Sequence, residues 1–154
     1  MKNTLSICYL VLFGQVAFSQ SPVFKSDKGV ALNGYDPVSY FTQNEAMRGS
    51  SEHMSKQGDV HFYFSTEANK VLFEEKPEAY LPQYGGFCAF AMANMGKAVP
   101  ADPTTFKFRD GKLYLFFNDF YEGKPFNTII PWNANEKDML TKADANWPDL
   151  SNGK

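Results

Sequence analysis

The chain has 154 residues, of which 44% are hydrophobic and 16% are aromatic. This length suits one domain rather than two, and this composition supplies a buried core, which excludes an intrinsically disordered protein. The formal net charge is −2 and both signs are scattered, so we expect no nucleic-acid partner bound through its phosphates.

The first nineteen residues are typical of a secretory signal peptide. Lys2 supplies a positive charge, residues 5–13 form an apolar run interrupted by Ser6, and residues 17–19 (Ala-Phe-Ser) fit the small-x-small cleavage rule. The apolar run is shorter than the roughly 20 residues that cross a membrane. We therefore expect residues 1–19 to be removed, leaving an exported protein, periplasmic or extracellular, without a membrane span. An uncleaved anchor is the alternative.

Cleavage leaves a single cysteine. Cys8 is removed with the signal peptide, so Cys88 remains alone and the mature chain has no internal disulfide. Residues 20–28 are polar and indicate a flexible leader, followed by a domain over residues 29–150. We detect no internal repeat and no low-complexity segment in that domain.

Turn and strand signals come first in the domain. Asn33-Gly34 and Asp36-Pro37 predict turns, and residues 38–41 form a short apolar stretch. Residues 51–56 and 59–64 predict two strands of one hairpin.

Helical signals follow this hairpin. Ser65 is predicted to cap a helix that Pro77 stops, and a short turn then ends at Pro82. Gly85-Gly86 permits positive φ and close backbone approach. Residues 89–95 are apolar and predict a short helix.

The last part of the chain predicts a hairpin and a helix. Residues 105–109 and 112–117 alternate in polarity around Asp110-Gly111, which is a strong type I′ turn signal. Pro131 suits a first helical position, and apolar residues at helical spacing predict a C-terminal helix that ends before Pro148. The order of elements predicts an α+β fold with a small, mainly antiparallel sheet and short helices.

Four segments of this chain resemble the YHS domain family, in particular its small exported bacterial members. The segments are NGYDPVSYF (33–41), HFYFSTEANKVLFEEKPEAYLPQYGGFCAF (61–90), DGKLYL (110–115) and KADANWP (142–148). The resemblance extends over roughly residues 30–148. It implies a relation to small cysteine-containing metal-binding modules that occur beside metal-transporting ATPases.

The chain departs from those metal-binding modules where they carry cysteines. Their cysteines follow an Asp-Pro-Val, lie in a Phe-Cys-Ser segment and stand on the next helix. Here these positions hold Ser39, Ser65 and Asn69. The resemblance therefore does not transfer that cysteine site to this chain. Cys88 resembles instead the cysteine of the exported subgroup. Naming within that subgroup points to selenocysteine in some members, and we expect those members to carry it at the position that Cys88 occupies here.

A soft-metal site around Cys88 is the leading hypothesis. In a helix over residues 88–95, Cys88 and Met92 lie on one face together with Met95, and thiolate with thioether suits Cu(I). His61 is a candidate nitrogen ligand, and His53 a weaker one. We expect Tyr84, Gly85 and Gly86 to shape the site. The alternative is that these sulfur atoms pack in the core.

No catalytic motif accompanies Cys88. The sequence contains no HExxH, CxxC, GxSxG, Walker A or GxGxxG pattern. We therefore expect a non-catalytic domain whose partner is a metal ion, copper or another soft transition metal, or another protein. Two further hypotheses stay open: a thiol redox protein in which Cys88 becomes a sulfenic acid, and a structural or interaction module in which Cys88 is inert.

Overall fold

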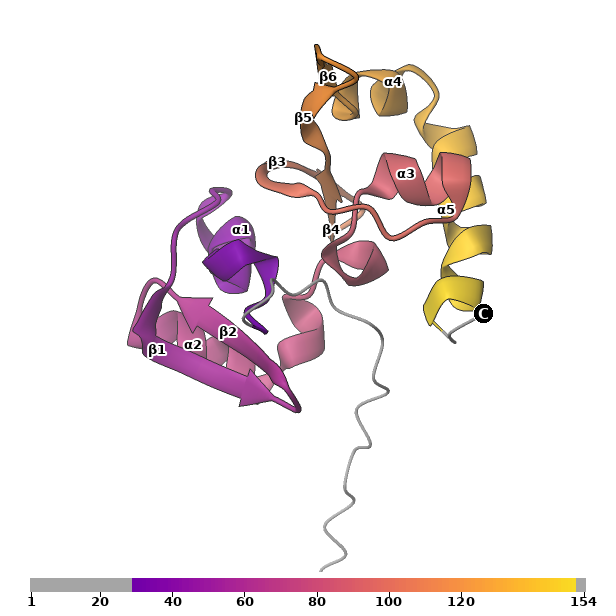
Figure 1. Cartoon of the computed structure of the whole chain (residues 1–154). Coiled ribbons are helices and arrows are strands. Elements are labelled where there is room, and N and C mark those ends of the chain that lie inside the picture. The colour runs from indigo at the N-terminus through magenta and orange to yellow at the C-terminus, as the bar shows by residue number, and fades with distance from the viewer. Residues whose placement is uncertain (1–28, 152–154) are drawn as a thin grey trace, which may run out of the picture.

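Short helices alternate with β-hairpins along residues 29–151, which are the residues that the computed structural model describes. Five α-helices and three two-stranded antiparallel sheets make up this part of the chain, which confirms the expected α+β class with short helices (Figure 1). The expected signal peptide and leader lie outside the described residues.

The first helix and hairpin are built around Asp36. The apolar stretch after Asp36 is helix α1 (Pro37–Gln43), with Pro37 at its first position and Asp36 as its N-cap. Strands β1 (Ser50–Gln57) and β2 (Val60–Phe64) then pair as predicted, with an irregularity in register between Ser50 and Met54.

Helix α2 (Glu67–Glu75) begins one residue later than the predicted cap implies. Thr66, not Ser65, is the N-cap, because its side chain accepts from the N–H of Asn69 at 3.1 Å. Ser65 donates its hydroxyl hydrogen to Asp36 instead. The prediction was therefore wrong by one residue, because a distant carboxylate engages Ser65.

The second half begins as the sequence predicts. Helix α3 (Ala89–Met95) and strand β4 (Lys112–Phe116) lie within one residue of the predicted bounds, whereas β3 (Asp102–Arg109) begins three residues before the predicted strand. Asp110 and Gly111 have φ values of 50° and 73°, as a type I′ turn requires.

The segment after β4 differs from the prediction. A third hairpin, formed by β5 (Asn118–Tyr121) and β6 (Lys124–Asn127), was not predicted. The C-terminal helix is divided into α4 (Ile129–Ala134) and α5 (Glu136–Ser151). Helix α5 also continues past Pro148, because a proline in the last turn removes few of the helix's backbone hydrogen bonds.

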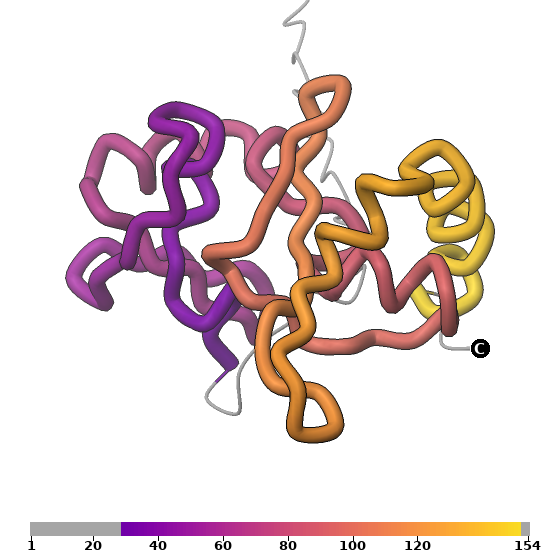
Figure 2. Tube along the Cα trace, turned by 90° about the horizontal axis from the view of Figure 1, so that it is seen from above, coloured from indigo at the N-terminus to yellow at the C-terminus, as the bar shows by residue number. Residues whose placement is uncertain are grey.

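Two groups of buried side chains form the core. The first surrounds Phe64 and Phe73 and includes Cys88, whereas the second surrounds Trp132 and Phe116. Figure 1 shows α1, α2 and the β1–β2 hairpin on one side of the molecule and α3 and α5 on the other. Figure 2 shows the β5–β6 hairpin projecting from the body. Within residues 29–151, no helix is both long enough and apolar enough to cross a membrane.

Asp36 connects these first-half elements through its fully buried carboxylate. Oδ1 accepts from the N–H of Val38 at 2.8 Å and of Ser39 at 3.3 Å, which caps α1. Oδ2 accepts from the N–H and hydroxyl of Ser65, at 2.8 and 2.7 Å, and from the amide of Asn69 at 2.7 Å. Because a buried charge is tolerated only when it is paired or hydrogen-bonded, these donors are what allow its burial.

We expect Asp36→Ala to lower the free energy of unfolding by about 3 kcal/mol, since it removes a helix cap and leaves buried donors on Ser65 and Asn69 unpaired. Urea denaturation followed by tryptophan fluorescence measures this change. Asp149→Ala removes an exposed carboxylate and serves as the control, with an expected change within about 0.5 kcal/mol. Equal stability of the two variants would contradict the connecting role of Asp36.

Candidate functional site

Cys88 is the N-cap residue of α3 and lies in the core. Its side chain is fully buried, and its backbone forms an isolated bridge with Leu115 of β4. The Sγ atom lies 3.3 Å from the backbone nitrogen of Phe117 and 3.4 Å from Oγ1 of Thr128. Residues 117 and 128 flank the β5–β6 hairpin, so the thiol joins α3 to both ends of that hairpin.

The polar contacts of Cys88 form a closed ring. The N–H of Phe117 donates to Sγ, and the Thr128 hydroxyl donates to the carbonyl oxygen of Phe117 at 2.9 Å. Because that hydroxyl hydrogen is used, the Cys88 thiol donates its own hydrogen to Thr128 Oγ1. The sulfur is thus engaged both as acceptor and as donor within the protein.

The structure places the three sulfur residues of the predicted site in different surroundings. Cys88 precedes the helix as its cap and packs in the first core group, whereas Met92 is buried in the second group with Trp132. Met95 is 55% exposed. The two methionines therefore point to different environments, one apolar and one aqueous.

His61 lies in the β1–β2 hairpin rather than beside Cys88. It pairs with Lys56 in β1, and its backbone exchanges hydrogen bonds with Gly29 and Ala31. Figure 1 places β2 and α3 on different sides of the molecule. His53, the weaker candidate, contacts Glu67 at 3.1 Å.

Among residues 29–151, no group of three or more His, Cys, Asp or Glu side chains is arranged to hold a metal ion. Cys88 belongs to the first core group and Met92 to the second, and His61 belongs to neither. A copper-type site with these ligands stays a prediction, without geometric support from their placement.

The predicted site-shaping residues form a left-handed turn. Tyr84, Gly85 and Gly86 have φ values of 54°, 63° and 83°. A Cβ atom at Gly86 would lie 2.9 Å from Cδ2 of Leu32 and 3.3 Å from Cγ of Pro82. The left-handed backbone at Gly86 therefore favours glycine, and the close approach that the sequence suggested is to neighbouring side chains.

Tyr84 is a buried aromatic residue with one polar contact. Its hydroxyl donates to Oδ1 of Asp144 at 2.8 Å, and its ring packs against Tyr114 and Trp147. Burial, reinforced by the hydrogen bond to Asp144, raises the pKa of Tyr84 well above its usual range. Tyr84 thereby connects the left-handed turn to α5.

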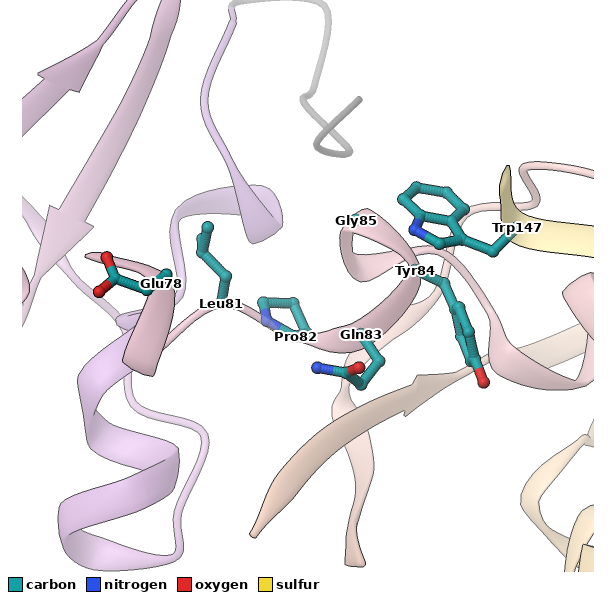
Figure 3. Close-up of a pocket in the computed structure, with 7 residues that line it drawn as sticks. All are labelled: Glu78, Leu81, Pro82, Gln83, Tyr84, Gly85 and Trp147. Carbon is teal, nitrogen blue, oxygen red and sulfur yellow. The ribbon is translucent and has the colours of Figure 1, made fainter. Parts of the chain in front are cut away.

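A small cleft lies beside this turn. It has a volume of about 190 Å³, and Figure 3 shows it between the segment before α3 and Trp147 of α5. Its lining residues are Glu78, Leu81, Pro82, Gln83, Tyr84, Gly85 and Trp147. Pockets for drug-sized ligands measure roughly 300–1,000 Å³, so this cleft accommodates at most one ring or side chain.

Sequence reasoning missed the partners of Cys88 and the cleft. Thr128 carried no recognisable signal, because a lone threonine between two predicted elements is unremarkable until the chain is folded. Trp147 was assigned only to the predicted C-terminal helix. Its position beside Tyr84 follows from the packing of α5 on α3, which no local pattern encodes.

The three positions that hold cysteines in the metal-binding relatives of the resembled family gather around Asp36. Ser65 and Asn69 donate to its carboxylate, and Ser39 donates its N–H to that carboxylate and its hydroxyl to the backbone carbonyl. Hydroxyl and amide groups are poor ligands for soft metals. This cluster is therefore a hydrogen-bonding centre and offers no thiolate.

Comparison with known proteins does not identify the chain. No protein-family model matches it, and no curated protein or solved structure matches it either. The resemblance to the YHS family rests on the four sequence segments quoted above.

We expect stability to fall at alkaline pH because Tyr84 is buried with a raised pKa. The unfolded chain releases the phenol proton near pH 10, whereas the folded protein retains it. The stabilisation that the protonated Tyr84 contributes is therefore complete below about pH 10 and is lost as the pH rises above that value. Tyr84→Phe should therefore show a shallower loss between about pH 9 and about pH 11. Urea denaturation at several pH values measures the slope.

Phe73→Leu is the control for this slope, since it weakens the core without removing a titrating group. It should lower stability equally at each pH. Parallel slopes for the wild type and Tyr84→Phe would contradict the assignment.

Proposed function

We propose that this chain is an exported, non-catalytic protein-binding module in which Cys88 is a structural residue. The observation that carries the proposal is the Cys88 sulfur, which is fully buried and hydrogen-bonded on both sides by Phe117 and Thr128. A thiol that reacts with substrates or binds a metal from solution needs an exposed or readily exposed sulfur. This geometry favours the interaction hypothesis over the redox and metal hypotheses.

Membership of the YHS family and export belong to the same proposal. The family assignment is supported by the quoted segments and by the convergence of Ser39, Ser65 and Asn69 on one residue, Asp36. Export is supported by the charged, apolar and small-residue pattern of residues 1–19. The proposed destination is the periplasm or the extracellular space.

The surface that best fits a protein partner is the β5–β6 hairpin with the start of α4. Phe120 is 68% exposed, Tyr121 59% and Ile130 67%, the three highest values among the exposed large apolar side chains of the described residues. Aromatic side chains anchor protein interfaces because they bury a large area at little cost in conformational entropy. A hairpin that exposes them contributes more to binding than to its own folding.

The hairpin is protected against docking by strand addition. The N–H of Phe120 donates to Oδ1 of the neighbouring Asp119 at 2.7 Å, and Pro125, which lies opposite Phe120, has no N–H. Blocked backbone donors discourage pairing with another strand. We therefore expect the partner to contact side chains of the hairpin and not its backbone.

A small-molecule role has less support. The cleft near Trp147 holds about 190 Å³, below the range for bound metabolites or drugs. Among its lining residues only Glu78 carries a charged side chain, so no acid and base pair faces it. Protein binding through the hairpin accounts for the exposed apolar side chains better than a ligand in this cleft does.

We expect Cys88 in the folded mature protein to react with the thiol reagent DTNB only as fast as the domain opens. Labelling should be complete within minutes in concentrated guanidinium, and equimolar Cu(I) under anaerobic conditions should not change the rate for the folded protein. A Ser51→Cys, Cys88→Ala variant supplies an exposed thiol as the control and should react at once.

Fast labelling that Cu(I) blocks would instead make Cys88 a metal ligand, and fast labelling indifferent to Cu(I) would favour redox chemistry. Either outcome would overturn the structural role of Cys88.

We expect Phe120→Ser and Ile130→Ser to change the free energy of unfolding by less than about 0.5 kcal/mol, because both side chains are mostly exposed. A photo-crosslinking residue at position 120, introduced in the cell that exports the protein, should yield a crosslinked product of defined mass. Ile130→Ser should abolish that product.

Position 71 on α2, where Val71 is 45% exposed, is the matched control for crosslinking. Equal crosslinking from positions 71 and 120 would contradict the proposal that the hairpin is the binding surface. Unfolding of the Phe120→Ser variant would contradict it as well, because the side chain would then be needed for the fold.

A further inference from the structure

The secondary structure of the first half recurs in the second half. Each α or β element between residues 37 and 64 has a counterpart of the same type and length, displaced by 52 residues. The pairs are α1 with α3 (37–43 and 89–95), β1 with β3 (50–57 and 102–109), and β2 with β4 (60–64 and 112–116).

Unusual backbone conformations recur at the same displacement. Leu32, Asn33 and Gly34 have φ values of 50°, 51° and 81°, and residues 84–86 have 54°, 63° and 83°. Left-handed conformations are uncommon outside glycine and cost about 1 kcal/mol or more. Two runs of three such residues, each just before a capped seven-residue helix, are therefore a specific likeness.

Hydrogen bonds and strand irregularities match as well. The N–H of Asp36 donates to Met47 at 2.9 Å, and that of Cys88 donates to Val99 at 2.9 Å. Isolated bridges pair residue 35 with 48 and residue 87 with 100. The register of the hairpins shifts between residues 50 and 54 in one half and between 102 and 106 in the other.

Asp36 and Cys88 occupy equivalent places in these two units. Both are N-caps, with φ and ψ of −73° and 113° for Asp36 and −59° and 115° for Cys88. Both side chains accept from a backbone N–H twenty-nine residues later, Asp36 from Ser65 at 2.8 Å and Cys88 from Phe117 at 3.3 Å. Each therefore ties the start of a helix to the end of the following hairpin.

The sequence conceals this likeness, which is why no internal repeat is detected in the sequence. Over residues 32–64 and 84–116, only three of 33 aligned positions are identical: Gly34 with Gly86, Ala46 with Ala98, and Phe64 with Phe116. Both glycines end a left-handed run, and both phenylalanines are fully buried.

We infer that the domain is an internal duplication of one unit, and that Cys88 is the counterpart of the buried anchor Asp36. The unit consists of a left-handed turn, a short helix with its N-cap residue, and a bulged hairpin. The first unit passes from β2 to α2 after two residues, whereas residues 117–135 separate β4 from α5 in the second. This added segment contains the exposed hairpin. The inference depends on backbone geometry and is independent of the proposed function.

The test replaces the thiol by the chemical group of its counterpart. The N–H groups of Val38 and Ser39 donate to the Asp36 carboxylate, and their counterparts in the second unit are the N–H groups of Phe90 and Ala91. In Cys88→Asp, these two groups should donate to the new carboxylate. We expect a cooperative thermal transition within about 10 °C of the wild type and an unchanged near-ultraviolet circular dichroism spectrum.

Met92→Asp is the matched control, because Met92 is fully buried on the same helix without an equivalent set of donors. It should lose the cooperative transition. The reciprocal variant, Asp36→Cys, should lower the midpoint less than Asp36→Ala does, since a sulfur can still accept from Ser65.

The inference fails if Cys88→Asp loses its transition as Met92→Asp does, or if Asp36→Cys is no more stable than Asp36→Ala.

Discussion

A buried side-chain acceptor at the start of a short helix holds each half of this domain together. Asp36 does so with five hydrogen bonds that join α1 to the β2–α2 connection. Neither α1 nor α3 is long enough to be stable by itself, and an isolated two-stranded hairpin is only marginally stable in water. The anchors therefore make each helix and its hairpin one cooperative unit, with the two core groups packed around them.

The chemistry of the anchor differs between the halves for a physical reason. Asp36 is surrounded by Ser39, Ser65 and Asn69, which supply enough donors for a buried carboxylate. Cys88 accepts from the Phe117 N–H and donates to the Thr128 hydroxyl oxygen, and these two contacts satisfy a neutral thiol at low cost. A lone cysteine that suggests reactivity in the sequence is, in this environment, a polar core residue.

The candidate site was only partly predictable. The glycines at 85 and 86 and the helix after Cys88 were recognised, because glycine pairs and apolar runs are local signals. The relation of Cys88 to Met92 and His61 was not recognised. Cys88 caps α3 and does not lie within it, and this difference decides where its side chain points. The exposure of Phe120 was likewise hidden, because nothing local tells an exposed aromatic side chain from a core one.

The sequence by itself determined the α+β class, the first two hairpins and the positions of α2 and α3 within a few residues, because turn residues, alternation and caps act over short distances. Only the tertiary structure decided that Ser65 serves Asp36, that α5 packs on α3, and that residues 32–64 recur as 84–116. Those features depend on contacts between residues far apart in the chain. The repeat is carried by backbone conformation, which many different side chains can satisfy.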